Sequence, residues 1–365
     1  MDMCNEISID TSKRITSLRF LLIVLVVFIH NNFTTEKILK AEQFGNTILF
    51  NQNVFGKWVQ LFISNAIALC AVPVFFMFSS FLQVKKGLPY KILIKKRIQS
   101  LLIPFLIWPL LNLLLTSFVK IILPASIFNN SNAFSFITWK PLDWFHFFLG
   151  YDLSSFDLHP YVGQFWFIRD LFILIIISPL ILSIMEKYPI SFFIFTLCVY
   201  FCNINFFIIE PKSFFYYIMG CYWAIYDFDL FYFVDKIKMI CLFPIFLMLF
   251  FLTYLISKNS YVLLELVSCL MILKLSKVII SHEKLNSLTR RLASYSFFLF
   301  CIHMPFLLGA LQKLWIKLFP MKNGFFCLFE YFCVTFLTII IGTGIGLILK
   351  KCLPKTFSFV TGGRK

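Results

Sequence analysis

A few ionisable side chains lie inside long apolar runs of the sequence, where a charge is costly. They are Arg19, His30, His303 and the neighbouring pair Arg169 and Asp170. Ionisable groups in such runs usually face a cavity or a partner, which makes each one a candidate for function. A histidine can take up and release a proton near neutral pH, because its unperturbed pKa is about 6.5. An arginine can hold an anionic group with several hydrogen bonds.

The spacing of Arg19 and His30 predicts that both face the same way. They are eleven residues apart, and eleven helical steps return to within about 20° of the starting face with a rise of about 16 Å. The other interpretation of Arg19 is an anchor whose long side chain reaches the membrane interface. For His30 the other interpretation is a packed core histidine.

His303 lies about twelve residues into a later apolar run that starts from the same side, so we expect it at a depth similar to that of His30. Its alternative role is a hydrogen bond between helices. Arg169 and Asp170 either neutralise each other locally or direct one side chain to a cavity near His30, because helix neighbours diverge by about 100°. Arg169 is therefore a further catalytic candidate.

Basic residues and prolines mark the elements that must position these groups. Lys95, Lys96 and Arg97 end the most basic loop, which is typical of a segment beside anionic lipid. A proline inside a helix removes a hydrogen bond and favours a kink that can line a cavity. Five prolines lie inside apolar runs, at Pro73, Pro104, Pro109, Pro179 and Pro305.

The composition identifies the bilayer as the solvent of this chain. Of 365 residues, 60% are hydrophobic and 14% are charged, whereas soluble domains are about half apolar and a quarter charged. The net charge of +16 gathers in short loops, which indicates membrane topology and excludes nucleic-acid binding. The eleven cysteines form no CxxC pair or metal-ligand spacing. We expect no metal, and one domain over residues 1–365.

Apolar segments long enough to cross about 30 Å of hydrocarbon occur at about ten places. They predict an all-α, polytopic membrane protein with spans near 17–33, 57–83, 98–124, 164–186, 190–208, 213–228, 238–257, 260–281, 292–316 and 324–350. With ten spans, the loops and tails of one side hold 21 Lys and Arg residues and those of the other side hold 9. The richer side is predicted to be cytoplasmic, and both termini lie there.

Five motifs occur in an order that resembles membrane acyltransferase family 3 over nearly the whole chain. They are Arg19 with His30 after ten intervening residues, Val72-Pro73-Val74-Phe75-Phe76-Met77-Phe78-Ser79, Lys96-Arg97-Ile98 through Pro104, Phe165-Trp166-Phe167-Ile168-Arg169-Asp170-Leu171, and Ser296 through His303. The chain departs from the family pattern at Ser100, where a second arginine is common, and at Ser79-Ser80, where Ser-Gly is usual.

The resemblance implies ten helices in a bacterial inner membrane and an O-acyltransferase. Such enzymes take an acyl group, most often acetyl, from cytoplasmic acetyl-coenzyme A and transfer it to a carbohydrate acceptor. His30 matches the catalytic histidine and Arg19 its paired basic residue. Arg97, with Arg19, is expected to bind the donor phosphates, and Arg169 and His303 are further catalytic candidates.

Two other functions fit the composition. A transporter or flippase for a glycan or small molecule also needs many helices and a few buried charges, although no repeated half is visible. A non-catalytic membrane subunit would not require a histidine and an arginine on one stripe. Turnover of acetyl-coenzyme A by the purified protein separates these functions.

Overall fold

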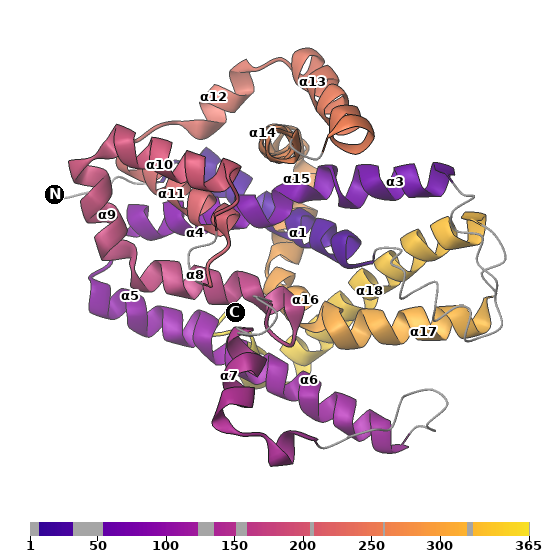
Figure 1. Ribbon diagram of the computed structural model, residues 1–365. Coiled ribbons are helices and arrows are strands. Elements are labelled where there is room, and N and C mark those ends of the chain that lie inside the picture. The colour runs from indigo at the N-terminus through magenta and orange to yellow at the C-terminus, as the bar shows by residue number, and fades with distance from the viewer. Residues whose placement is uncertain are drawn as a thin grey trace.

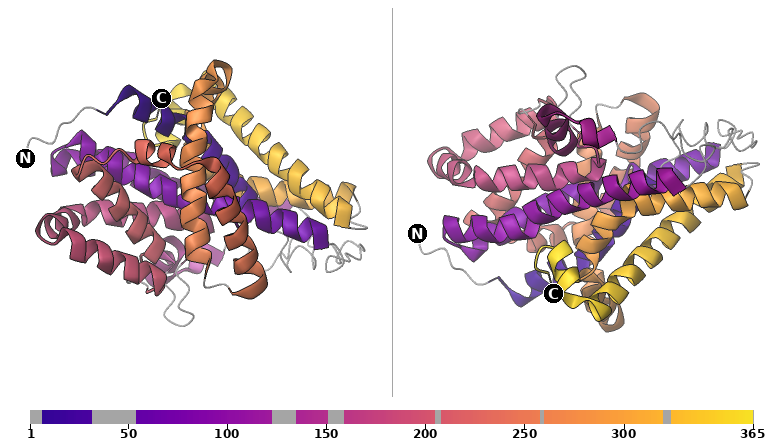
Figure 2. Two further views of the ribbon diagram at one scale, coloured as in Figure 1. Left: turned by 90° about the horizontal axis from the view of Figure 1, so that it is seen from above. Right: turned by 90° about the horizontal axis from the view of Figure 1, so that it is seen from below.

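The computed structural model describes residues 7–31, 54–122, 135–150, 159–204, 208–257, 260–319 and 324–364. Helices make up the regular structure of these residues and none of them forms a β-strand. The predicted all-α fold is therefore confirmed. Figure 1 and Figure 2 show long helices that lie side by side.

The α-helices are α1 (Ile9–His30), α3 (Val54–Ser64), α4 (Ala71–Lys86), α5 (Tyr90–Arg97), α6 (Ile103–Ile122), α7 (Pro141–Leu149), α8 (Trp166–Ile176), α9 (Ser178–Lys187), α10 (Pro189–Phe201), α11 (Pro211–Ile225), α12 (Leu230–Lys236), α13 (Met239–Phe251), α14 (Tyr261–Ser281), α15 (Glu283–Ala293), α16 (Ser296–Ile302), α17 (Leu308–Leu318), α18 (Gly324–Cys352) and α19 (Pro354–Val360). Short 3₁₀ and π segments are η2 (Ile67–Cys70), η3 (Ile98–Leu102), η4 (Ser135–Thr138), η5 (Gly163–Phe165), η6 (Leu252–Ile256) and η8 (His303–Leu307).

Helix α1 lies at the centre of the fold. Its apolar run contains neither glycine nor proline, and the Ser8 side chain accepts a hydrogen bond from the Thr11 N–H at 3.1 Å, which caps the first turn. Leu18, Leu22 and Val27 are completely buried. The helix packs against α3, α4, α14, α15, α16 and α18. A helix surrounded in this way holds its polar residues at fixed positions.

The N-terminal half of α1 is held by an ion pair between Arg14 and Asp235, which we call the clasp. Arg14 donates two hydrogen bonds to the Asp235 carboxylate, at 2.9 and 3.0 Å, and one to Ser276 Oγ at 2.7 Å. Lys277 Nζ lies 3.3 Å from the same carboxylate. Only 2% of the surface of Arg14 is exposed. The clasp joins α1 to α12 and α14.

Helices α4 and α11 cross at very short range. A Cβ atom added to Gly220 would lie 2.0 Å from Ser80 Oγ and 2.2 Å from the Met77 carbonyl oxygen. Small residues permit this approach between helices in a membrane. The contact fixes α4, whose last turn leads through Gly87, with φ of 52°, into the basic helix α5.

The described residues contain five helical stretches with the length and composition of a membrane span, or six if the bent pair of α8 and α9 counts as one span. The predicted number of ten is not confirmed. Helices α10 and α11 have 13 and 15 residues, which is about 20 and 22 Å of helix, less than the hydrocarbon thickness. Helices α1 and α14 are long enough, but each carries at least three charged residues.

Two of the five prolines accompany breaks in the helices. A bend of 60° separates Gly163–Ile176 from Ser178–Lys187 beside Pro179. Before Pro305 the backbone of Met304 is extended, with φ of −129° and ψ of 156°. Pro73 and Pro104 closely follow the 3₁₀ segment η2 and the π segment η3, where the regular α-helical hydrogen bonding is already interrupted. Pro109 lies inside α6.

Candidate active site

The structure brings His30 and His303 into contact. His30 is the last residue of α1 and His303 follows the last residue of α16. His303 Nε2 lies 3.2 Å from His30 Nδ1, and the ring centroids are 5.0 Å apart. His303 is fully buried, whereas His30 is partly exposed. The two histidines, which we expected at a similar depth, thus lie side by side.

Backbone contacts indicate which nitrogen of each neutral ring carries the hydrogen. His303 Nδ1 lies 2.7 Å from the Phe300 carbonyl oxygen, and His30 Nδ1 lies 2.9 Å from that of Val26. A carbonyl can only accept, so both Nδ1 atoms are donors. His303 Nε2 is therefore an acceptor for the His30 Nδ1–H. The lone pair of His30 Nε2 is left for chemistry.

The C-terminal end of α1 is held by several buried polar side chains. Asn31 donates to the Tyr331 carbonyl and to Thr335 Oγ1, both at 3.0 Å, and its Oδ1 accepts from Gln312 at 2.7 Å. Ser64 Oγ donates to the Phe28 carbonyl at 2.7 Å, which satisfies an otherwise open group of the last turn. These bonds hold the last turn of α1, which carries His30.

His303 is positioned by the break between α16 and the π segment η8. The extended backbone of Met304 turns its carbonyl towards Gln164, whose Nε2 donates to it at 2.6 Å. Gln164 is buried, and its Oε1 has no hydrogen-bond partner among the described residues. The sequence showed Gln164 only as the residue before a motif. A buried amide contact with a distant break in a helix leaves no signal in the local sequence.

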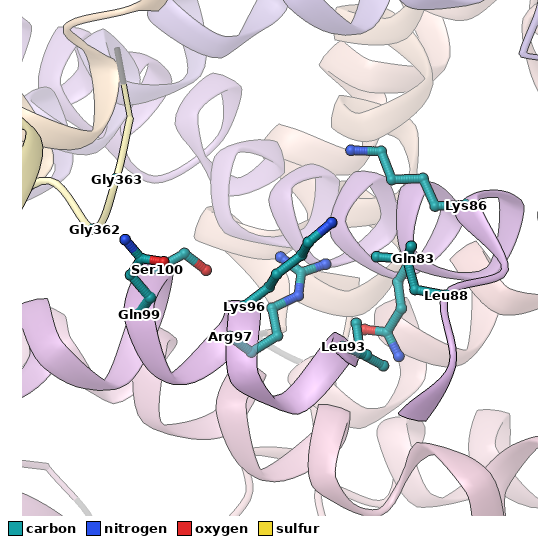
Figure 3. A pocket seen from close by; sticks show the side chains of 10 residues that line it. All are labelled: Gln83, Lys86, Leu88, Leu93, Lys96, Arg97, Gln99, Ser100, Gly362 and Gly363. Carbon is teal, nitrogen blue, oxygen red and sulfur yellow. The ribbon is translucent and has the colours of Figure 1, made fainter. Parts of the chain in front are cut away.

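Basic residues gather around a cavity of about 530 Å³ between α4, α5, η3 and the C-terminal segment. Figure 3 shows Lys96 and Arg97 rising from α5 towards Lys86 of α4, with Gly362 and Gly363 beside Gln99 and Ser100. We call this space the basic cavity. Arg97, predicted to bind a donor phosphate, lines it directly.

Arg19 lies on the exposed side of α1, and its charge acts on Lys86 together with those of Arg97 and Lys96. It therefore belongs to the electrostatic surroundings of the basic cavity. Arg19 and His30 lie eleven helical steps apart on α1, which is a rise of about 16 Å. The basic cavity and the histidine pair are thus connected by the central helix.

The structure places Arg169 in a buried ion pair on α8. Its guanidinium donates twice to Asp170 Oδ1, at 2.8 and 3.0 Å, and once each to the Leu149 and Ile208 carbonyl oxygens, at 2.6 and 2.7 Å. The other oxygen of Asp170 accepts from Ser213 Oγ at 2.8 Å. These contacts favour local neutralisation, the first of the two roles considered for Arg169. They join α8 to the ends of α7 and α11.

A second buried carboxyl group was missed in the sequence. Glu265 of α14 is 2% exposed and accepts a hydrogen bond of 2.5 Å from the Tyr200 hydroxyl. The Tyr216 hydroxyl lies 3.5 Å from that of Tyr200. The cost of an ionisable group inside an apolar run marks Glu265 in the same way as it marks His30.

Comparisons with known proteins agree with the motifs. A family described as an acyltransferase domain matches residues 12–349. The succinoglycan biosynthesis protein ExoH of Rhizobium meliloti (strain 1021) is 25% identical over 187 residues, which are 49% of this chain and 45% of that protein. The match thus spans less than half of that relative. No solved structure matches. Since the family match covers most of the sequence, the chain belongs to membrane acyltransferase family 3.

Proposed function

We propose that this protein is an O-acyltransferase that moves acetyl or another short acyl group from cytoplasmic acyl-coenzyme A to a carbohydrate hydroxyl. The acceptor is a cell-surface glycan or its lipid-linked precursor, and the enzyme lies in a bacterial inner membrane. Family membership supports acyl transfer, and the relative named for succinoglycan biosynthesis supports a glycan acceptor. The observation that carries the proposal is the contact between His30 and His303.

In the proposed reaction His30 Nε2 removes the proton of the acceptor hydroxyl. The oxygen attacks the thioester carbonyl carbon, the carbon–sulfur bond breaks, and the proton passes from His30 to the leaving thiolate. The positive charge on His30 is stabilised through Nδ1–H by the Val26 carbonyl and by His303 Nε2. A neutral, buried partner suits this role because it orients the base without competing for the proton.

A covalent route would use the same nitrogen. His30 Nε2 would attack the thioester, release the thiolate, carry the acyl group as an acyl-imidazole and pass it to the hydroxyl oxygen. The position of His30 at the end of α1, away from the basic cavity, is compatible with both routes. Trapping an acylated His30 by mass spectrometry, without acceptor, distinguishes them.

The basic cavity fits the phosphate groups of the donor. Coenzyme A carries a diphosphate and a 3′-phosphate, and such groups require cations or backbone N–H groups. Lys86, Lys96 and Arg97 line one space, and Arg19 adds a charge nearby. We assign Arg19 and Arg97 to donor binding. The pantetheine arm would then extend along α1 towards His30.

The experiment is to incubate the purified protein in detergent with acetyl-coenzyme A, with and without a lipid-linked oligosaccharide acceptor, and to measure free thiol and acylated product. We expect thiol release that depends on the acceptor and scales with the amount of folded protein. Accumulation of the acceptor inside vesicles without thiol release would instead establish a transporter or flippase, and the proposal would be wrong.

A further inference from the structure

The C-terminal segment after α19 folds back against η3. Gly362 and Gly363 adopt positive φ values of 69° and 82°. A Cβ atom added to Gly362 would lie 2.6 Å from the Cα atom of Ser100 and 2.8 Å from the Gln99 carbonyl oxygen. Only glycine combines this conformation with so close a contact. The segment therefore packs at a defined position against η3 and forms one side of the basic cavity.

The guanidinium group of Arg364 holds this residue against η3 and Phe297. Nη1 donates to the Ser100 carbonyl at 3.0 Å and to the Thr361 carbonyl at 2.5 Å, and the guanidinium carbon lies 3.6 Å from the ring centroid of Phe297. These bonds use both hydrogens of Nη1. The N–H groups of Nε and Nη2 make no hydrogen bond to any described residue. Three donors are thus held in place for another acceptor.

Arg364 belongs to a cluster of cations that also contains Arg19 and Arg97. Burial, with the positive charges of Arg19 and Arg97, lowers the pKa of Arg364 to about 10. Three guanidinium groups from α1, α5 and the C-terminal segment therefore repel one another in the free protein. An anion bound among them relieves this repulsion, and a phosphate oxygen satisfies the open N–H groups.

We propose that Arg364 is a third cationic contact for the phosphate groups of the acyl donor, delivered to the basic cavity by the C-terminal segment. The inference rests on the proposed function, because it assumes coenzyme A as the ligand. The inference adds Arg364, a residue of the C-terminal segment that lies outside the five sequence motifs, to the donor site.

The experiment is calorimetric titration of coenzyme A into the purified full-length protein and into Arg364→Gln. We expect the dissociation constant to rise about 10- to 100-fold, the loss of one hydrogen-bonded charge contact. Lys355→Gln is the matched control, because it removes one exposed charge from α19 of the same segment. It should bind as the wild type does.

A rescue variant separates charge from structure. Ser100 lines the basic cavity one helical turn beyond Arg97, so Ser100→Arg with Arg364→Gln should restore much of the affinity. Arg364→Lys keeps the charge without the stacking and should bind between wild type and Arg364→Gln. If Arg364 served packing alone, the lysine variant would lose thermal stability with the glutamine variant and the dissociation constant of the folded protein would not change. That result would overturn the inference.

Two further outcomes have separate meanings. A wild-type protein that neither binds coenzyme A nor transfers an acyl group would refute the proposed function itself. A wild-type protein that does both, together with Arg364→Gln of unchanged affinity, would refute only the role of Arg364. If Arg364→Gln bound coenzyme A normally but retained less phosphatidylglycerol from mixed micelles, the cation would serve a lipid headgroup, and the inference would again be wrong.

Discussion

Replacing His303 by alanine should slow acyl transfer without weakening donor binding. In the structure His303 Nε2 accepts from His30 Nδ1–H at 3.2 Å, in a fully buried position. This contact becomes charge-assisted only after His30 has taken up a proton or bonded to the acyl group. The interaction is thus stronger in the transition state than in the ground state, and its loss should lower kcat while the KM for acyl-coenzyme A stays unchanged.

The magnitude follows from the type of bond that is lost. A hydrogen bond to a charged group contributes about 1.5–3 kcal/mol, which corresponds to about 10- to 100-fold in kcat. The Val26 carbonyl remains as a partner of Nδ1, so some activity should survive. In a His30→Ala background the second substitution should have no further effect, because the two residues act as one unit.

The assay is steady-state acyl transfer by the purified variant, expressed per folded molecule after a thermal-unfolding scan. His282→Ala is the matched control, because His282 Nδ1 also contacts the carbonyl oxygen four residues earlier, that of Val278, at 2.9 Å, but in an exposed position. A folded His303→Ala protein with wild-type kcat would show that the contact does not assist His30.

Three further predictions concern the donor site, the clasp of α1 and the topology. Arg97→Ala should raise the KM for acetyl-coenzyme A more than it lowers kcat, because a phosphate contact acts alike on ground and transition states; an unchanged KM would remove Arg97 from the donor site. Asp235→Asn should cost about 3 kcal/mol of unfolding free energy by leaving Arg14 buried without its partner. Although burial alone raises the pKa of Asp235, Arg14 and Lys277 lower it overall. This stabilisation is therefore complete above about pH 5 and is lost as the pH falls below about 4, through the lowered pKa of the folded protein. Unfolding scans in detergent from about pH 7 to about pH 2 measure the loss, and an Asn variant with the same acid sensitivity as wild type would contradict it. Tyr90→Cys in a cysteine-free background should be labelled only after permeabilisation; labelling in intact cells would reverse the topology.

The sequence predicted the helical membrane fold and the family, and it led us to expect His30 and His303 at a similar depth. Helical geometry gives the depth of His30 and His303, because each lies a known number of residues from a basic flank. It does not predict the contact between their rings. That contact depends on the helix break at Met304 and on the bond from Gln164, which joins residues far apart in the chain.

Two features could not be predicted from the sequence. They are the number of membrane spans and the position of Arg364 beside the basic cavity. Apolar runs look alike whether a helix is long enough to cross the bilayer or is shorter, as α10 and α11 are. Arg364 lies in a short polar tail that carries no periodicity. Its position is set by two glycines with positive φ and by a close backbone contact with Ser100, which are properties of the folded chain.

The most direct test of the central claim is acyl transfer by His30→Ala and His30→Gln, measured with thermal stability in the same preparations. If His30 Nε2 is the base, both folded variants should lose about 10²- to 10⁴-fold in kcat, with coenzyme A binding retained at the basic cavity. If His30 carries the acyl group covalently, no turnover above background should remain. Near wild-type transfer by folded His30→Ala protein would contradict the account.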